Sequence, residues 1–175
     1  MSTRSTVQMT ECSGLWQRTL LIDSDGSRDV STGVAWLQGI TAYADTRGFA
    51  GRLSQHDDVF AWQRLIDVEP QGPFPDEGRM RWEAGVLIER GVHQNYAEHW
   101  VRRDGPAAPC WALFGANAIL LCAGAQFGWA DRRGVALGTI GDPQWTALNP
   151  HMNGSDLVAN GVRWNIEDSE GDVDL

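Results

Sequence analysis

The chain has 175 residues, which suffices for one domain with a hydrophobic core of its own. Its formal net charge is −9, so we expect no nucleic-acid partner, because binding to phosphates needs basic patches. All 14 basic residues are arginines, which excludes Schiff-base chemistry and a P-loop lysine.

The cysteines and the N-terminal segment indicate a cytosolic chain. Cys12, Cys110 and Cys122 are odd in number and lack a C-x-x-C spacing, so we expect neither a disulfide framework nor a zinc or iron–sulfur site. Residues 1–14 contain no apolar signal segment, and no apolar run is long enough to span a bilayer. The histidines show no metal-ligand spacing. We therefore predict no metal, no cofactor and no membrane partner.

Taken in chain order, short apolar runs alternate with Gly, Pro, Asn and Asp, which is typical of a sandwich or a barrel. Residues 23–26 are an expected turn, and residues 70–78 an expected connection, because prolines cannot donate to a strand ladder. Residues 110–123 form the most apolar run, whose alanines also permit a short helix. Strands are expected at residues 15–22, 34–37, 43–47, 59–69, 79–89, 96–103, 110–123, 127–130, 135–140 and 162–166.

This pattern predicts an all-β protein that closes into an antiparallel barrel of about eight to ten strands, since closure removes hazardous sheet edges. Residues 14–167 would form this single β-barrel domain. Residues 1–13 are expected to be a flexible N-terminus. Residues 168–175 are expected to be a flexible acidic tail, because acidic side chains cluster there.

Strand alternation assigns side chains to faces, because successive residues of a strand point to opposite sides of the sheet. In several strands an arginine or a carboxylate shares a face with large aromatic rings. The sets that share a face are Trp16, Arg18, Leu20 and Ile22; Tyr43, Asp45 and Arg47; Phe60, Trp62, Arg64 and Ile66; and Tyr96, Glu98 and Trp100. In the run 79–89, the set Met80, Trp82, Ala84, Val86 and Ile88 opposes Arg81, Glu83 and Leu87.

Unpaired buried charge is strongly unfavourable, so we expect opposite charges to meet inside the barrel. Two interpretations of these charged faces stay open. They form a structural salt-bridge network that fills the barrel, or they line a pocket for a polar ligand.

Several blocks of the chain resemble one known family. Residues 153–167 (NGSDLVANGVRWNIE) are similar to the closing strand of a calycin family, which is named for a small yeast protein that interacts with a casein kinase. The resemblance implies a closed calycin/lipocalin-like barrel whose end can open to a cavity, and it implies no established catalytic residues. Further similar blocks are YAEHW at 96–100, WLQ at 36–38, YADTR at 43–47 and WQRLID at 62–67.

The leading functional hypothesis is the binding of a small-molecule ligand that is partly apolar and anionic. Arginines would hold its carboxylate through paired hydrogen bonds, and tryptophans would stack on its apolar part. The expected ligand-binding residues are Trp16, Arg18, Tyr43, Arg47, Trp62, Arg64, Glu83, Tyr96 and Trp100.

Two other functions stay open. The first is a cofactor-free lyase, isomerase or hydratase that acts on a small carbonyl compound, with Glu98, His99 or Asp45 as general acid or base. The second is a solidly packed barrel that acts as an interaction protein. A homodimer is also considered, because the run 110–123 is apolar on both faces.

Overall fold

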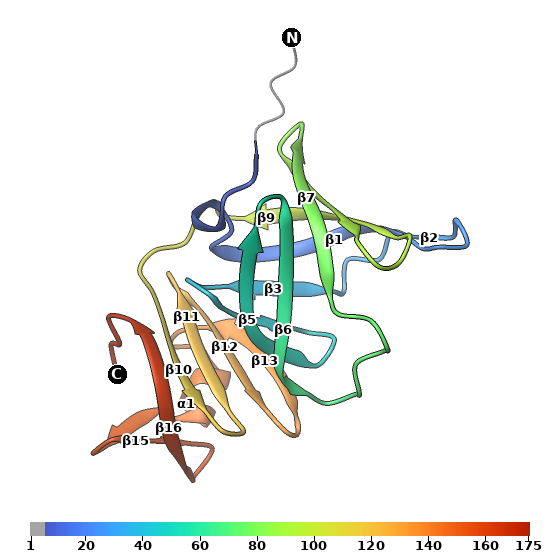
Figure 1. Cartoon of the computed structure of the whole chain (residues 1–175). Helices are drawn as coiled ribbons and strands as arrows, with labels where there is room; N and C mark the ends of the chain where they lie inside the picture. Colours follow the sequence, from blue (N-terminus) through green and yellow to red (C-terminus); the bar gives the residue numbers. More distant parts are fainter. Residues whose placement is uncertain (1–5) are drawn as a thin grey trace.

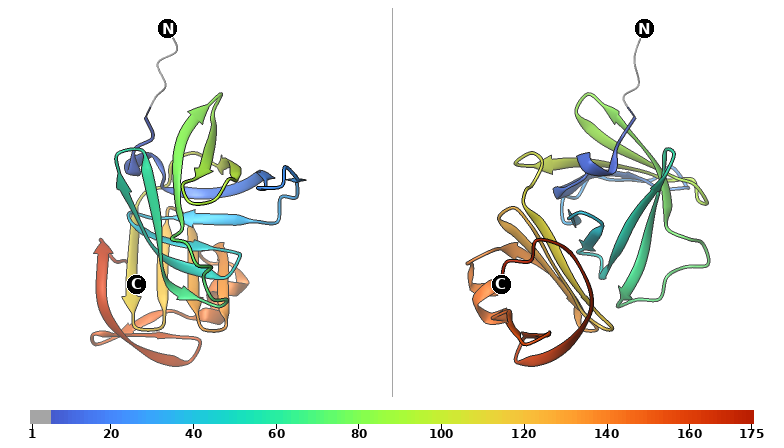
Figure 2. Two further views of the ribbon diagram at one scale, coloured as in Figure 1. Left: turned by 45° about the vertical axis from the view of Figure 1, so that its right-hand side comes forward. Right: turned by 60° about the vertical axis from the view of Figure 1, so that its left-hand side comes forward.

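The computed structural model describes residues 6–175, and nearly all of its regular structure is β-strand. Within these residues the strands form a closed antiparallel barrel of eight strands and a second sheet of seven strands (Figure 1). The prediction of an all-β protein with a closed antiparallel barrel is confirmed. Figure 2 shows the two sheets side by side, with the acidic C-terminal end on the second sheet.

The barrel closes because its first and last strands pair with each other, which leaves no free edge. Its neighbours follow chain order, and β2 (Arg28–Asp29) adds a short ladder at the end of β1. The barrel strands are β1 (Gly14–Ile22), β3 (Ala35–Gln38), β4 (Ala42–Asp45), β5 (Phe49–His56), β6 (Val59–Asp67), β7 (Glu77–Glu83), β8 (Val86–Gly91) and β9 (Ala97–Arg103).

The second sheet differs from the expected single barrel over residues 14–167. The run 110–123 is neither one strand nor a helix but a hairpin, and the strands that follow continue this new sheet. The sheet has the order β13-β12-β11-β10-β16-β15-β14. Its elements are β10 (Cys110–Gly115), β11 (Ile119–Ala123), β12 (Gln126–Asp131), β13 (Gly134–Thr139), α1 (Pro143–Leu148), β14 (His151–Asn153), β15 (Asp156–Ala159) and β16 (Val162–Gly171).

Both faces of the hairpin β10–β11 are covered by the chain itself. One face packs on the outside of the barrel, where small side chains permit close approach: a Cβ atom at Gly128 would lie 3.2 Å from Cβ of Ala44. The other face is covered by α1 and by the strands β14 to β16. The apolar character of residues 110–123 is therefore satisfied within one chain, and it no longer argues for a homodimer.

The acidic C-terminal end is part of the fold through Gly171. Backbone N–H groups of Thr41 and Ala42 donate to Oε1 of Glu170 at 2.9 and 2.7 Å. Arg52 forms ion pairs with Glu170 and Asp168. The prediction of a flexible tail that begins at residue 168 is therefore wrong for residues 168–171, because their carboxylates bind donors on the barrel.

Residues 6–13 close one end of the barrel and include a short 3-10 helix, η1 (Met9–Glu11). Val7 and Cys12 are buried there, and Trp16 Nε1 donates to the carbonyl of Cys12 at 2.7 Å. The predicted flexible N-terminus is thus wrong for residues 6–13, while residues 1–5 lie outside the described residues. Within the part of the chain that the structure describes, neither η1 nor α1 is long and apolar enough to cross a membrane.

Candidate functional site

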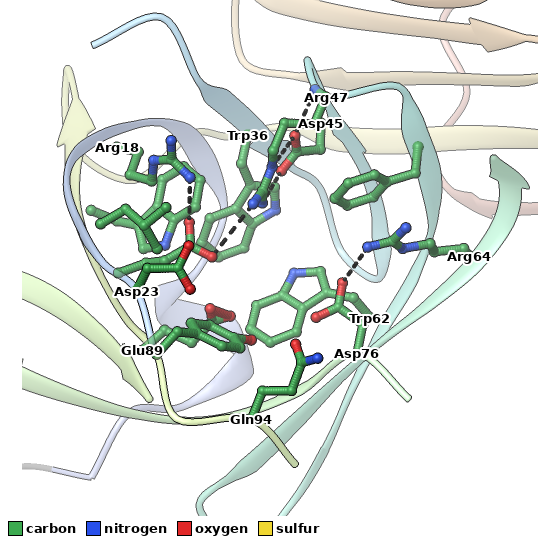
Figure 3. A pocket seen from close by; sticks show the side chains of 15 residues that line it. Arg18, Asp23, Trp36, Asp45, Arg47, Trp62, Arg64, Asp76, Glu89 and Gln94 are labelled. Atoms are coloured by element: carbon green, nitrogen blue, oxygen red, sulfur yellow. Dashed lines mark hydrogen bonds and ion pairs between the residues drawn. The ribbon is translucent and has the colours of Figure 1, made fainter. Parts of the chain in front are cut away.

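A cavity of about 250 Å³ occupies the end of the barrel opposite residues 6–13 (Figure 3). Residues from the later part of β1 line it, whereas the N-terminal segment packs near the start of that strand. The lining residues are Arg18, Leu21, Asp23, Trp36, Asp45, Arg47, Phe49, Trp62, Arg64, Asp76, Glu89, Gln94, Tyr96, Glu98 and Trp100.

A cluster of indole rings forms the apolar wall of the cavity, with Trp36 at its centre. Trp62 and Trp100 meet Trp36 edge-on, with ring centroids 5.9 and 5.6 Å away. Trp16 stacks on Trp36 at 5.5 Å, is fully buried and does not line the cavity. Edge-on and stacked rings at these distances attract each other, and Trp36 Nε1 donates to Gln38 Oε1 at 3.0 Å. The wall is therefore rigid before any ligand binds.

The arginines of the cavity are already held by carboxylates. Arg18 contacts Glu98 at 3.3 Å and Asp29 at 3.5 Å. Arg64 contacts both Asp67 and Asp76 at 3.1 Å, and its guanidinium lies over the Phe49 ring at 3.7 Å. Figure 3 shows the ion pair between Arg64 and Asp76 at the cavity. The Nη atoms of Arg18 and Arg64 therefore bind carboxylates before a ligand arrives, whereas Nε of each is buried without a hydrogen-bond partner among the described residues.

Arg47 follows β4 and folds back over the cavity. Its Nη2 and Nε atoms donate to the two oxygens of Asp45 at 2.8 and 3.0 Å, and its Nη1 lies 3.4 Å from Glu98. Burial lowers the pKa of Arg47, but the hydrogen bonds and the charge of Asp45 outweigh burial and raise it above its usual value. Arg47 thus stays charged and bridges Asp45 to Glu98.

Glu89 is the buried carboxyl group that this network does not neutralise. It lies directly opposite Glu98 on the neighbouring strand, and both side chains belong to residues that are 4% exposed. Among the described residues, no N–H or hydroxyl group donates to Glu89, and no arginine forms an ion pair with it. Burial, followed by the negative charge of Glu98, raises the pKa of Glu89 well above its usual value.

Gly78 of the neighbouring strand β7 has no side chain, and this leaves room for the side chain of Glu89. A Cβ atom at Gly78 would lie only 2.6 Å from Cγ of Glu89, so another residue there would displace this side chain. Asp76 lies next to Gly78, in the residues that lead into β7. Burial raises the pKa of Asp76, although its hydrogen bond with Arg64 opposes the rise.

The structure brings most of the predicted site residues together. Eight of them line the cavity: Arg18, Asp45, Arg47, Trp62, Arg64, Tyr96, Glu98 and Trp100. Four do not. Trp16 and Tyr43 are fully buried in the barrel core, Glu83 pairs with Arg81 at the surface, and His99 lies on the outer face of β9, opposite Ile88.

Two β-bulges explain why alternation failed in part. The register shifts after Arg18 in β1, so Leu21, rather than Leu20, shares the inner face with Glu98. A second shift in β6 turns Ile66 outward, where it packs against the second sheet. A bulge adds one unpaired residue and reverses the alternation beyond it.

Glu89 was missed because the run 79–89 was treated as one strand. It is a hairpin whose turn residues, Ala84 and Gly85, both have positive φ. The turn places Met80 opposite Glu89, so the two side chains share the inner face. Gly85 was the available signal, since a glycine between two alternating runs is typical of a two-residue hairpin. The other missed lining residues are Leu21, Asp23, Trp36, Phe49, Asp76 and Gln94.

The fold and the site together define a β-barrel protein with an internal cavity, walled by indole rings on one side and by charged groups on the other. No protein-family model, curated protein or solved structure matches the chain. Within residues 6–175, no group of three or more His, Cys, Asp or Glu side chains is arranged to hold a metal ion. The functional argument therefore depends on the geometry and charge of the cavity.

Proposed function

We propose that the barrel binds a small organic cation, such as a protonated amine, with its charge against Glu89 and its apolar part against the indole rings. The observation that carries this proposal is the buried Glu89 carboxyl, which lines the cavity and forms no ion pair with an arginine among the described residues. A buried carboxylate is poorly hydrated, so a cation that pairs with it gains more than the same contact gives in water.

The charge around the cavity favours a cation over the anion expected from the sequence. Among the described residues that line it, five are acidic and three are arginines. The Nη atoms of the arginines lie 2.8–3.5 Å from carboxylates, so an anionic ligand that bound these atoms would have to displace those partners. A protonated amine leaves those ion pairs in place and approaches Glu89, with which no arginine of the described residues forms an ion pair.

The size and the walls of the cavity limit the ligand. A volume of about 250 Å³ corresponds to roughly eight waters at ~30 Å³ each, which suits an amine with one small ring. The rings of Trp62 and Trp100 provide apolar surface, and the face of an indole ring attracts a nearby cation, as Arg47 over Trp100 at 5.8 Å shows. This keeps the partly apolar ligand of the sequence hypothesis and changes the sign of its charge.

The test uses three probes of similar shape: phenethylammonium, 2-phenylethanol and phenylacetate. Calorimetric titration is expected to show binding of the ammonium ion and weaker or no binding of the alcohol and the carboxylate. Glu89→Gln should weaken ammonium binding by about tenfold or more, the loss typical of one charge-assisted hydrogen bond.

Glu83→Gln is the matched control, because Glu83 lies in the same hairpin as Glu89 but is paired with Arg81 at the surface. Affinity should be unchanged in this variant. Equal or tighter binding of phenylacetate, or full affinity in Glu89→Gln, would contradict the proposal.

The same carboxyl pair supports a second candidate, the acid–base enzyme considered from the sequence. A carboxyl that retains its proton beside one held by arginines is an arrangement that proton-transfer enzymes use. Glu89 and Glu98 would then carry the chemistry, and His99 would not, because it lies on the outer face of the barrel. Consumption of a metabolite by the protein, but not by Glu89→Gln or Glu98→Gln, would favour this candidate over simple binding.

We also propose that the protein is cytosolic and belongs to the calycin family that the sequence blocks resemble. The three free cysteines support the cytosol, where thiols stay reduced. The closed antiparallel barrel with a cavity at one end supports the family assignment. Oxidation state in cell extracts, and homologues that retain Glu89 and Glu98, are the corresponding tests.

A further inference from the structure

We infer that Glu89 and Glu98 hold one proton between them when the cavity is empty, and that an incoming ammonium group displaces this proton into solvent. The inference rests on the proposed function and adds a coupling to it: binding of the cation and release of a proton are one event. It concerns how the site is regulated by pH, which ligand affinity alone does not reveal.

The geometry of the pair favours a shared proton. Glu89 and Glu98 are directly opposite on β8 and β9, and both are 4% exposed. Directly opposite residues have Cβ atoms roughly 4.5–5.5 Å apart, so two ionised carboxylates there would repel each other strongly. Taking the second negative charge out of water adds to this cost. One proton shared by the pair removes the repulsion.

The surroundings assign this proton to Glu89. Arg18 and Arg47 each bind one oxygen of Glu98, at 3.3 and 3.4 Å, and so stabilise its ionised form. The groups that face Glu89 are Glu98 from β9, Tyr96 from the residues before β9, Asp76 from the connection before β7, and Arg47 from the turn after β4. β7 contributes the uncharged Gly78 and Met80 at this level.

Most of these neighbours raise the pKa of Glu89. Burial contributes most, and the charges of Glu98 and Asp76 also raise the pKa, while the charge of Arg47 lowers it. The proton shared by the pair therefore resides on Glu89, which can donate it in a hydrogen bond to the Glu98 carboxylate.

The exchange reaction is balanced in charge and atoms. Before binding, the neutral carboxyl of Glu89 keeps its proton and donates a hydrogen bond to the Glu98 carboxylate. On binding, the ammonium ion enters with its own protons, the O–H bond of Glu89 breaks, and this proton leaves to water or buffer. The ammonium group then donates to the Glu89 carboxylate, and the net charge of the cavity is unchanged. No oxidant, reductant or cofactor takes part.

Coupling predicts a definite pH dependence. While Glu89 is protonated in the empty protein, each unit of pH increase should raise the affinity for the ammonium ion by up to tenfold. The rise should end once the pH exceeds the pKa of Glu89. The probe itself stays charged over this range, since an alkylammonium group titrates near ~10, as lysine does. A fixed carboxylate such as an ordinary exposed glutamate would give no such rise above about pH 5.5.

The experiment titrates phenethylammonium into the full chain in two buffers with different enthalpies of ionisation. The difference between the two heats gives the number of protons released per ligand. We expect about one proton from the protein below the pKa of Glu89 and none from Glu89→Gln. Glu83→Gln should release the same number as the unchanged protein.

Asp76 is the competing source of the proton, because burial also raises the pKa of Asp76 in the same cavity. Asp76→Asn should still release a proton, over a pH range that ends lower, because the charge of Asp76 helps to raise the pKa of Glu89. Loss of release in Asp76→Asn, with retention in Glu89→Gln, would overturn the assignment to Glu89. Binding without any proton release would overturn the coupling while leaving the proposed function in place.

A ligand-free measurement keeps the inference testable if the probe does not bind, which would count against the proposed function alone. The side-chain carboxyl carbons of glutamate can be labelled with ¹³C and followed by NMR as the pH is raised. One resonance, absent in Glu89→Gln, should titrate well above the ordinary glutamate range. If every resonance titrates in the ordinary range, the shared proton does not exist.

Discussion

The barrel and the second sheet are built from similar antiparallel strands but treat buried charge differently. Of the charged residues that are buried in the described chain, Arg18, Asp45, Glu89 and Glu98 lie in the barrel and Asp131 in the second sheet. Asp131 accepts hydrogen bonds from Trp129 Nε1 at 3.1 Å and from a backbone N–H at 2.8 Å. Its carboxylate is satisfied by nearby residues of its own strand and turn, whereas Glu89 has no donor among the described residues.

Under the proposed function, this difference separates the structural carboxylate of Asp131 from the ligand-binding carboxylate of Glu89. A buried acceptor with local donors stabilises its surroundings, while one without donors lowers stability until something binds it. The hollows of the two regions also differ in the residues that line them. Residues of several barrel strands line the barrel cavity, whereas a few residues, among them Trp164 and Arg132, line the hollow on the second sheet.

Trp36→Ala should lower the free energy of unfolding by about 3–5 kcal/mol, the range for removing a buried aromatic ring. Trp36 is 2% exposed and contacts three other indole rings at 5.5–5.9 Å. Urea denaturation followed by circular dichroism measures the change. A loss below about 1 kcal/mol would show that the indole cluster is not the centre of the barrel core.

Glu98→Gln should lower the free energy of unfolding by about 2–3 kcal/mol, because it leaves charge on Arg18 and Arg47 less well compensated. Arg18 still has an ion pair with Asp29, and Arg47 still has one with Asp45. The loss of stability should therefore be smaller than the loss caused by a buried charge without any partner. Denaturant titration of the variant beside Glu89→Gln provides the measurement. If Glu98→Gln and Glu89→Gln lose equal stability, Glu98 is not the glutamate that compensates the charge of the two arginines.

Asp131→Ala should lower the free energy of unfolding by about 1–2 kcal/mol, since it removes an acceptor from two donors in the second sheet. Ligand binding in the barrel should be unaffected. The same denaturant titration, combined with calorimetry using phenethylammonium, tests both parts. A change in ligand affinity would show that the two sheets are coupled.

The stability contributed by Glu89 should fall as the pH rises. Its folded-state pKa is raised, so its contribution is fully present below the ordinary glutamate pKa of ~4.3 and is lost as the pH rises through the folded-state value. The slope should reach at most about 1.4 kcal/mol per pH unit. Asp76, whose pKa is also raised, adds to the slope in the same direction.

Urea denaturation at several pH values, compared between the unchanged protein and Glu89→Gln, isolates this contribution. The variant should show a shallower decline and should equal or exceed the unchanged protein in stability at higher pH. A parallel pair of curves would mean that Glu89 titrates normally.

Glu83→Gln should change stability by less than about 1 kcal/mol, because its ion pair with Arg81 is exposed to solvent. This is the smallest expected effect, and it matters because Glu83 and Glu89 lie on the same hairpin. Thermal denaturation of both variants at one pH gives the comparison. If Glu83→Gln and Glu89→Gln change the stability equally, the surface side and the cavity side of the hairpin do not differ as proposed.

The sequence predicted the inner faces correctly where a strand is regular. In β4 and β9 the alternation holds, so Asp45, Glu98 and Trp100 lie in the cavity wall as expected. It failed where the ladder is irregular. The bulges after Arg18 and Arg64 reverse the alternation, and nothing in those residue types marks a bulge.

The rest of the site depends on contacts that a single strand pattern cannot reveal. Asp76 comes from a connection without alternation, and only the fold brings it to Arg64. The second sheet was missed for a related reason. An apolar run such as residues 110–123 fits either a barrel wall or a layer between two others, and which of these it forms depends on what covers each face.

The most direct test of the central claim is a crystal structure of the protein with phenethylammonium bound. The account predicts density inside the barrel, with the ammonium nitrogen within hydrogen-bond distance of Glu89 and the ring against Trp62 and Trp100. An empty barrel cavity at saturating ligand, or a ligand found only in the hollow beside Trp164, would contradict it.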